Sequence, residues 1–133
     1  MIYEDVFERL EREGVAYVVV GGVALVLHGF DRPTADLDLV VDCAGDGAER
    51  ATRALAGAGF FPTVPLPLSA LTVLRMLDRG GRQVDVFARF LVPFAELLAG
   101  STQVLVGATP VRVASLEHMA RVLRLGAQGG EKV

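Results

Sequence analysis

The sequence VVVGGVALVLHGFDRPTADLDL, residues 18–39, decides the fold. A run of β-branched residues ends at Gly21-Gly22, an apolar helical segment follows, and a polar loop leads to Asp36 and Asp38. A glycine turn that opens a helix offers free N–H groups to phosphate oxygens, and two carboxylates on one strand face suit a divalent metal. If both features lie close in space, this stretch forms a nucleotide-handling site.

The second predicted strand, residues 36–41, alternates between two kinds of side chain. Asp36 and Asp38 share one face of this strand, whereas Leu37 and Leu39 share the other. Successive side chains of a strand point to opposite faces of a sheet. The leucine face therefore belongs to the core, and the two carboxylates project from the opposite face.

Asp85 is the third carboxylate of interest, because it lies between Val84 and Val86 in the predicted strand 83–89. A lone carboxylate in an apolar strand is costly to desolvate unless a cation or hydrogen-bond donors meet it. If Asp85 lies beside Asp36 and Asp38, three carboxylates repel one another unless divalent cations neutralise them, and such hard oxygen ligands suit Mg²⁺. The simpler alternatives are a tight glycine turn without a ligand and solvent-facing aspartates.

The remaining elements follow from hydrophobic periodicity and from the positions of glycine and proline. Asp46 with Glu49 resembles a capping box, and Ser115 is placed to cap the last helix. Residues 60–68 contain three prolines and allow at most a short edge strand. The predicted helices are 2–13, 23–28, 46–58, 93–99 and 115–125, and the other predicted strands are 15–20, 71–77, 103–106 and 111–113.

Length and composition predict one α/β domain over residues 1–133, with a frayed tail over 126–133. The chain has 133 residues, of which 52% are hydrophobic, and a net charge of −3, which gives no basis for bulk binding of DNA. Cys43 is the single cysteine, so no intrachain disulfide forms. Residues 1–14 do not have the pattern of a secretory leader, and the apolar run 15–27 is too short for a membrane span. We therefore expect a soluble, cytoplasmic protein.

Three motifs together resemble the DNA polymerase β-like nucleotidyltransferase superfamily. They are Gly21-Gly22, the Asp36-Leu-Asp38-Leu39 sequence after thirteen intervening residues, and the Val84-Asp85-Val86 sequence. The loop Arg32-Pro-Thr34-Ala-Asp36 is similar to that of small prokaryotic members. These include aminoglycoside nucleotidyltransferases and the nucleotidyltransferase toxins of abortive-infection and toxin–antitoxin systems.

The resemblance implies a mixed sheet with helices on one face and the three aspartates on the other. Asp36 and Asp38 would bind two Mg²⁺ ions, and Asp85 would bind one of them and accept the proton of the attacking hydroxyl. The implied reaction, of EC 2.7.7 type, transfers a nucleoside monophosphate from an NTP such as ATP to a small molecule, RNA or protein and releases pyrophosphate. Gly21, Gly22, Arg32 and Thr34 are the candidate nucleotide contacts, although Arg32 could instead pair with Asp31.

Two departures from the family pattern bear on the acceptor. Leu123 stands where many relatives have a lysine, and the single lysine of the chain is Lys132. The sequence leaves two other functions open, a partner-binding module of toxin–antitoxin type and a structural domain with an acidic face. Dimerisation with a second copy of the chain, or a cognate protein partner, could supply a substrate wall. His28, His118, Arg121 and Arg124 are interpreted as helix-end or solvated side chains.

Overall fold

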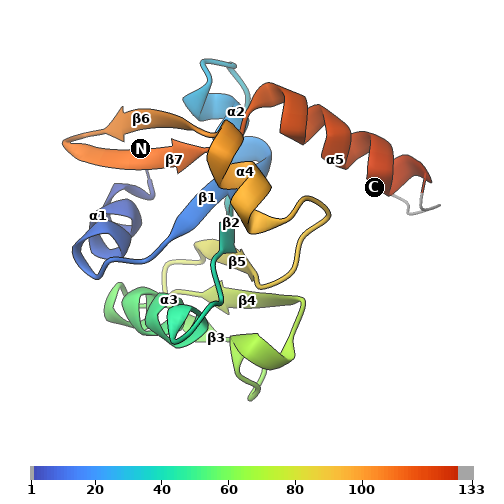
Figure 1. Cartoon of the computed structure of the whole chain (residues 1–133). Coiled ribbons are helices and arrows are strands. Elements are labelled where there is room, and N and C mark those ends of the chain that lie inside the picture. The colour runs from blue at the N-terminus through green and yellow to red at the C-terminus, as the bar shows by residue number, and fades with distance from the viewer. Residues whose placement is uncertain (1, 129–133) are drawn as a thin grey trace.

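The computed structural model describes residues 2–128 and contains a seven-stranded mixed sheet with the strand order β3-β4-β5-β2-β1-β7-β6. β2 and β5 run parallel at the centre, as do β1 and β7, and the remaining neighbours are antiparallel. The expected mixed α/β architecture is confirmed (Figure 1).

The observed elements agree closely with those predicted. The strands are β1 (Tyr17–Val20), β2 (Asp36–Val41), β3 (Phe61–Pro62), β4 (Val73–Leu77), β5 (Gln83–Phe87), β6 (Thr102–Val106) and β7 (Thr109–Val113). The helices are α1 (Glu4–Arg12), α2 (Gly21–Leu27), α3 (Gly47–Gly57), α4 (Phe94–Gly100) and α5 (Leu116–Gln128), with a 3-10 turn at Leu68–Ala70. α2 begins directly at the glycine pair, two residues earlier than predicted. Gly21 has φ 73°, a left-handed conformation that glycine adopts readily, so the change of direction from β1 into α2 occurs at this single residue.

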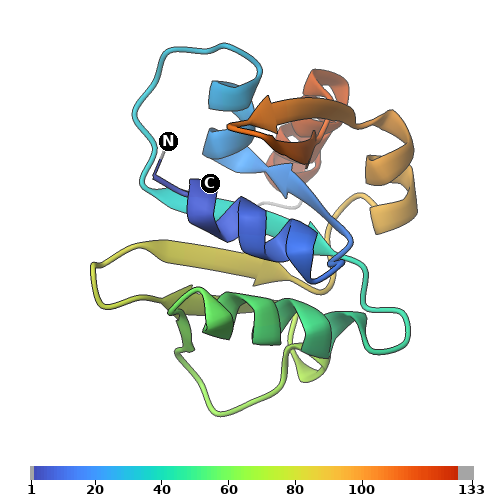
Figure 2. The same ribbon diagram turned by 90° about the vertical axis from the view of Figure 1, so that its left-hand side faces the viewer.

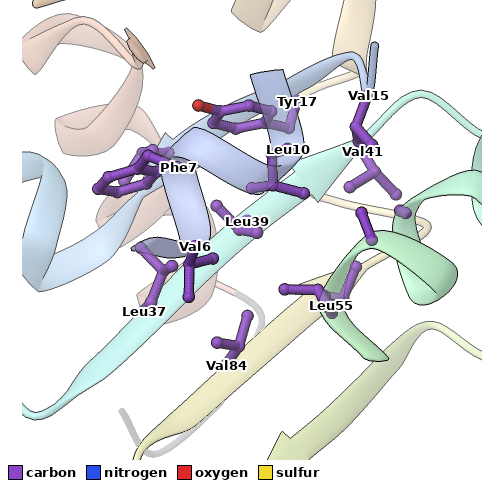
Figure 3. Close-up of a cluster of buried hydrophobic side chains, with 14 of the residues drawn as sticks. Val6, Phe7, Leu10, Val15, Tyr17, Leu37, Leu39, Val41, Leu55 and Val84 are labelled. Carbon is purple, nitrogen blue, oxygen red and sulfur yellow. The ribbon is translucent and has the colours of Figure 1, made fainter. Parts of the chain in front are cut away.

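α1 and α3 cover one face of the sheet and form the larger core with it (Figure 2). Val6 and Phe7 of α1 lie over Leu37 of β2, and Leu55 of α3 lies near Val84 of β5 (Figure 3). All five of these side chains are buried. The leucines of β2 therefore point into the core as predicted, and Asp36 and Asp38 are left on the opposite face.

The opposite face is also partly covered, which the sequence interpretation did not expect. Val18, Val20 and Val40 form a second buried cluster there, together with Leu97 of α4. Met119 of α5 packs against the same cluster. The expectation of helices on one face is therefore correct for α1 and α3, whereas α4 and α5 pack on the other face. α4 and the first half of α5 close one end of the aspartate face.

The two predicted helix caps have different outcomes. The hydroxyl of Ser115 accepts a hydrogen bond from the backbone N–H of His118 at 3.0 Å, which confirms this cap of α5. The Asp46 side chain caps nothing, since its carboxylate accepts a bond from Arg50 at 3.0 Å one turn later. The predicted capping box is therefore wrong, because an ion pair along α3 takes up the carboxylate.

α5 continues through Gln128, three residues beyond the predicted end, so the first part of the expected frayed tail is helical. The rest of that tail, residues 129–133, lies outside the described residues. Within residues 2–128, no helix combines the length and the apolar character needed to cross a membrane.

Candidate active site

The pairing of β2 with β5 brings the aspartates together. In this parallel pair, Asp38 is the register partner of Asp85, and Asp36 is the partner of Gln83. Neighbouring strands lie about 4.8 Å apart, and residues two apart on a strand share a face. The sequence prediction that Asp85 lies beside Asp36 and Asp38 is therefore confirmed as a matter of position. Three carboxylates occupy adjoining positions of one sheet face.

Two side chains that sequence reasoning missed occupy the same face. Arg75 of β4 donates to Asp85 through Nε at 3.1 Å and Nη2 at 3.4 Å. The Gln83 amide donates to Asp36 at 3.2 Å and to Asp85 at 3.4 Å. The signal for Arg75 was present in the β-hairpin, because antiparallel pairing across its turn sets Arg75 opposite Asp85. Arg75 neutralises Asp85, and among the described residues neither Asp36 nor Asp38 forms an ion pair.

The surroundings of Asp38 disfavour the ionised form of its carboxyl group. Burial raises the pKa of the Asp38 carboxyl to about 6, and repulsion from Asp85 and Asp36 adds to the effect, although Arg75 opposes it. Both causes disfavour the ionised form. A carboxylate beside two like charges, with its pKa near neutrality, is a position where binding a cation would release free energy.

The glycine turn lies directly against this aspartate. A Cβ placed on Gly21 would overlap the Asp38 carboxylate, and one placed on Gly22 would stand 2.9 Å from the Thr34 hydroxyl. Arg32 lines one cavity together with both glycines and Asp38. Three of the four candidate nucleotide contacts therefore share a cavity with Asp38, and the fourth, Thr34, lies against Gly22. Within residues 2–128, Arg32 makes no ion pair with Asp31, so the alternative suggested by the sequence is wrong.

We predict that Gly21→Ala destabilises the protein by more than the strain of its backbone alone. A left-handed alanine costs about 1 kcal/mol, and the overlap with Asp38 adds to this cost. Gly45→Ala is the control, because Gly45 has φ 58° and nothing within 4 Å of an added Cβ. Urea unfolding of Gly21→Ala, in the wild-type and in the Asp38→Ala background, measures the part of the destabilisation that the overlap with Asp38 causes. Equal costs in both backgrounds would show that the turn does not press on Asp38.

Tyr3 bridges the starts of β2 and β5, the two strands that carry the aspartates. Its hydroxyl donates to the carbonyl of Ala35, which precedes Asp36, and at 3.0 Å to the carbonyl of Gln83. Arg82 reinforces this corner, with its guanidinium 5.7 Å from the centre of the Tyr3 ring and ion-paired to Asp78 at 2.7 Å. Tyr3 is also buried in the core, and the sequence does not indicate its role at these two strands.

Other titratable side chains have structural roles or adjoin the site. His28 ends α2 as predicted, and its Nε2–H donates to the Ala114 carbonyl at 2.7 Å. Cys43 is partly buried, and burial raises the pKa of its thiol. His118 is not on a solvated face. Its side chain is only 17% exposed, its Nε2 lies 3.4 Å from Glu96, and its buried Nδ1 has no hydrogen-bond partner among residues 2–128. The polar residues around it in α5 hid this packing from sequence analysis.

The donor set fits Mg²⁺ by chemistry, because carboxylate oxygens are its preferred protein ligands. Within residues 2–128, however, no group of three or more His, Cys, Asp and Glu side chains is spaced to hold a metal ion. The Asp85 carboxylate already has two partners, because Arg75 and Gln83 both donate hydrogen bonds to it. Arg75 therefore occupies the place on Asp85 that a metal ion would take.

Comparison with solved structures places this geometry in a known fold. A candidate nucleotidyltransferase from Thermotoga maritima superposes with a TM-score of 0.73 at 20% sequence identity, covering 97% of this chain and 85% of its own. The chain has the nucleotidyltransferase fold. This confirms the fold that the glycine pair and the three aspartates suggested, and it does so over nearly the whole described chain.

Two antibiotic-modifying proteins share the nucleotidyltransferase fold with this chain. The lincosamide antibiotic adenylyltransferase LnuA, solved with lincomycin, has a TM-score of 0.61 at 14% identity over 84% of this chain and 77% of its own. ANT(2'')-Ia, solved with adenylyl-2''-tobramycin, has a TM-score of 0.67 at 16% identity over 96% of this chain and 75% of its own. No protein-family model and no curated protein matches the sequence. At these identities the likeness concerns the fold alone.

Proposed function

We propose that the protein is a Mg²⁺-dependent nucleotidyltransferase that places a nucleoside monophosphate on a hydroxyl of a small molecule. The observation that carries this proposal is the register of Asp38 with Asp85, directly beside the glycine turn at Gly21. A fold built only for stability gains nothing from setting carboxylates beside one another on a half-buried face. The adenylyl product and the antibiotic ligand seen in structural neighbours support an NTP donor and a small acceptor.

Asp36 and Asp38 are the residues that would hold two Mg²⁺ ions, with Asp85 as a further ligand of one. When bound, the metal supplies positive charge to the triphosphate and to the attacking oxygen. Asp38 contributes most to this affinity, because burial and two neighbouring carboxylates destabilise its ionised form. The amide of Gln83 donates to both Asp36 and Asp85 and holds them in orientation.

The acceptor hydroxyl is activated by proton transfer to the Asp85 carboxylate. The oxygen of the acceptor hydroxyl attacks the α-phosphorus of the NTP. The bond between that phosphorus and the oxygen that bridges it to the β-phosphorus breaks, and pyrophosphate leaves. Gly21 and Gly22 adjoin Asp38 and Thr34, and their backbone N–H groups would bind the triphosphate oxygens. Arg32 and Thr34 flank the same position and would contact its oxygens.

One observation favours a second candidate function, a partner-binding module of toxin–antitoxin type. Leu116 is 45% exposed and Leu123 is 64% exposed on α5. Apolar side chains in such a row often mark a protein interface. Sedimentation with and without Mg²⁺-NTP tests this alternative. A stable complex or dimer without any nucleotide effect would favour it over the enzyme.

The direct test of the proposed function is to incubate the full chain with each of the four NTPs, Mg²⁺ and a panel of hydroxyl acceptors, and to measure pyrophosphate. We expect release that requires both Mg²⁺ and an acceptor. Asp42→Asn is the matched control for the aspartate variants. Asp42 lies just after β2 and its Oδ1 caps the backbone N–H of Ala44 at 3.0 Å, a role that asparagine retains. Absence of release with every NTP and acceptor would contradict the proposal.

Arg75→Met is expected to raise the affinity for Mg²⁺. Arg75 is the internal cation bonded to Asp85, so its removal frees that carboxylate for a metal ion. The neighbouring carboxylates then repel one another more strongly until an ion binds. Thermal unfolding across a Mg²⁺ titration should show a half-maximal shift at about tenfold lower concentration, which corresponds to about 1.4 kcal/mol.

Arg79→Met is the matched control for this change. Arg79 lies in the same β-hairpin, and among the described residues it makes no ion pair. It removes the same charge from the protein without touching the aspartates. Equal Mg²⁺ responses in Arg75→Met, Arg79→Met and the wild type would show that Arg75 does not compete with the ion.

A further inference from the structure

A cavity of about 610 Å³ adjoins the aspartates on the face that α4 and α5 partly cover. Asp38, Gly21 and Gly22 are among its lining residues, so the cavity adjoins one of the three carboxylates and the glycine turn. Its volume is that of a typical small-molecule site, for which about 300–1,000 Å³ is usual. A molecule in this cavity can present an oxygen beside Asp38.

The walls of the cavity are mainly apolar. Phe87 and Phe90 meet edge to face with ring centres 5.2 Å apart, and both line the cavity. Leu97 of α4 and Met119 of α5 lie on other walls. Aromatic and aliphatic side chains of this kind bind flat or alicyclic carbon skeletons, because each Å² of apolar surface removed from water contributes about 25 cal/mol.

The charged groups of the cavity decide which acceptors it suits. Within residues 2–128 its ionisable lining consists of Asp38, Arg32 and His118, and the carboxylate among them is the expected metal ligand. His118 faces Glu96 through Nε2 at 3.4 Å, but Glu96 does not line the cavity. A polycation would lose its hydration here without finding carboxylates to replace it. The lining therefore disfavours acceptors that carry several amino groups.

Resting on the proposed function, we propose that this cavity is the acceptor site and that the acceptor is an uncharged hydroxyl compound with a largely apolar ring skeleton. Its hydroxyl lies at the Asp38 end and its skeleton lies between the two phenylalanines and α5. The oxygen forms the new bond to the α-phosphorus, the proton passes to Asp85, and pyrophosphate carries away the electron pair of the broken bond. This acceptor class differs from amine-rich tobramycin, whose adenylyl product is bound by ANT(2'')-Ia.

The first experiment measures binding of 2-naphthol to the full-length protein by calorimetry, with neither nucleotide nor metal present. Ala120 lines the cavity and is exposed, so Ala120→Trp fills the space without disturbing the core. Glu117→Trp is the matched control, because Glu117 is exposed on the same helix and does not line the cavity. We expect Ala120→Trp to weaken 2-naphthol binding at least tenfold and Glu117→Trp to leave it within twofold.

Two further probes separate the competing occupants. Tobramycin should not bind to the cavity, and Mg²⁺-ATP should bind together with 2-naphthol instead of displacing it. The inference is overturned if 2-naphthol does not bind, if Ala120→Trp binds it as the wild type does, or if tobramycin binds in a manner that Ala120→Trp abolishes. Competition between Mg²⁺-ATP and 2-naphthol, with both weakened by Ala120→Trp, would assign the cavity to the nucleobase and also overturn the inference.

The last arm adds Mg²⁺-ATP to the naphthol complex and measures pyrophosphate and the naphthyl ester of AMP. Formation of the ester that is lost in Ala120→Trp supports both the acceptor site and the transfer reaction. Binding of 2-naphthol without any response to Mg²⁺-NTP would contradict the proposed transfer and leave the cavity as an apolar ligand site. Nucleotidyl transfer to other acceptors without naphthol binding would contradict the acceptor class alone.

Discussion

Asp38→Asn is expected to abolish nucleotidyl transfer and at the same time to stabilise the ligand-free protein at pH 8. Asp38 adjoins the glycine turn and is the register partner of Asp85, so its loss removes the central ligand of the proposed metal site. A loss of about 4 kcal/mol of transition-state stabilisation corresponds to about a thousandfold lower turnover. Pyrophosphate release under saturating Mg²⁺-NTP measures this effect, with Asp42→Asn as the control.

The stability effect has the opposite sign and follows from the pKa of Asp38. Folding raises this pKa from 3.8 to about 6, because burial and then Asp85 and Asp36 disfavour the charged form. The folded state therefore holds a proton that the unfolded state has lost, and stability declines as the pH rises from about 4 to above 6. The decline is about 2 kcal/mol, allowing for the solvent that reaches this half-buried group.

Urea unfolding at pH 4.5 and pH 8 checks this sign without nucleotide or metal. The wild type should lose stability between the two pH values, and Asp38→Asn should lose less and be the more stable protein at pH 8. Asp42→Asn should behave as the wild type does. An Asp38→Asn protein that is less stable than the wild type at pH 8 would show that the carboxylate is well accommodated without a bound cation.

Asp85→Asn is expected to lower the rate of transfer by about 100-fold or more while Mg²⁺-NTP still binds. General-base catalysis by a positioned carboxylate contributes typically about 10²–10⁴-fold. The amide keeps the shape of the side chain, and Asp36 and Asp38 keep their place on β2. We therefore expect the dissociation constant of Mg²⁺-ATP to change by less than about tenfold, which separates a fall in kcat from a loss of binding.

Single-turnover transfer and calorimetric binding of Mg²⁺-ATP, measured on the same preparations, test this separation. Arg75 complicates the comparison, because Asp85→Asn also removes its ion-pair partner. The double variant Asp85→Asn with Arg75→Met controls for that change and should transfer as slowly as the single variant. Recovery of transfer in the double variant would show that a misplaced Arg75, and not the missing base, caused the loss.

The sheet could be predicted from sequence because its strands carry strong local signals. The alternation in residues 36–41 determined which way Asp36 and Asp38 point, and the valines around Asp85 determined its face. The pairing partner was harder to predict, because parallel strands far apart in sequence pair through tertiary packing. Family resemblance supplied that link, and the observed register of β2 with β5 confirmed it.

The partners of the aspartates could not be predicted in the same way. Arg75 and Gln83 reach the carboxylates across strand pairs, and an arginine in an exposed strand position usually faces only water. The packing of α4 and α5 on the aspartate face was missed for a related reason. α4 is short, and the polar residues His118, Arg121 and Arg124 suggested a solvated face of α5, although His118 is largely buried.

The most direct test of the central claim is calorimetric binding of α,β-methylene-ATP, which cannot undergo transfer, to the wild type and Asp38→Asn with and without Mg²⁺. The account predicts binding at one site per chain that requires Mg²⁺ and weakens at least about 100-fold in Asp38→Asn, or about 2.7 kcal/mol. Equal binding with and without Mg²⁺, or unchanged affinity in Asp38→Asn, would contradict the assignment of this aspartate face as a metal–nucleotide site.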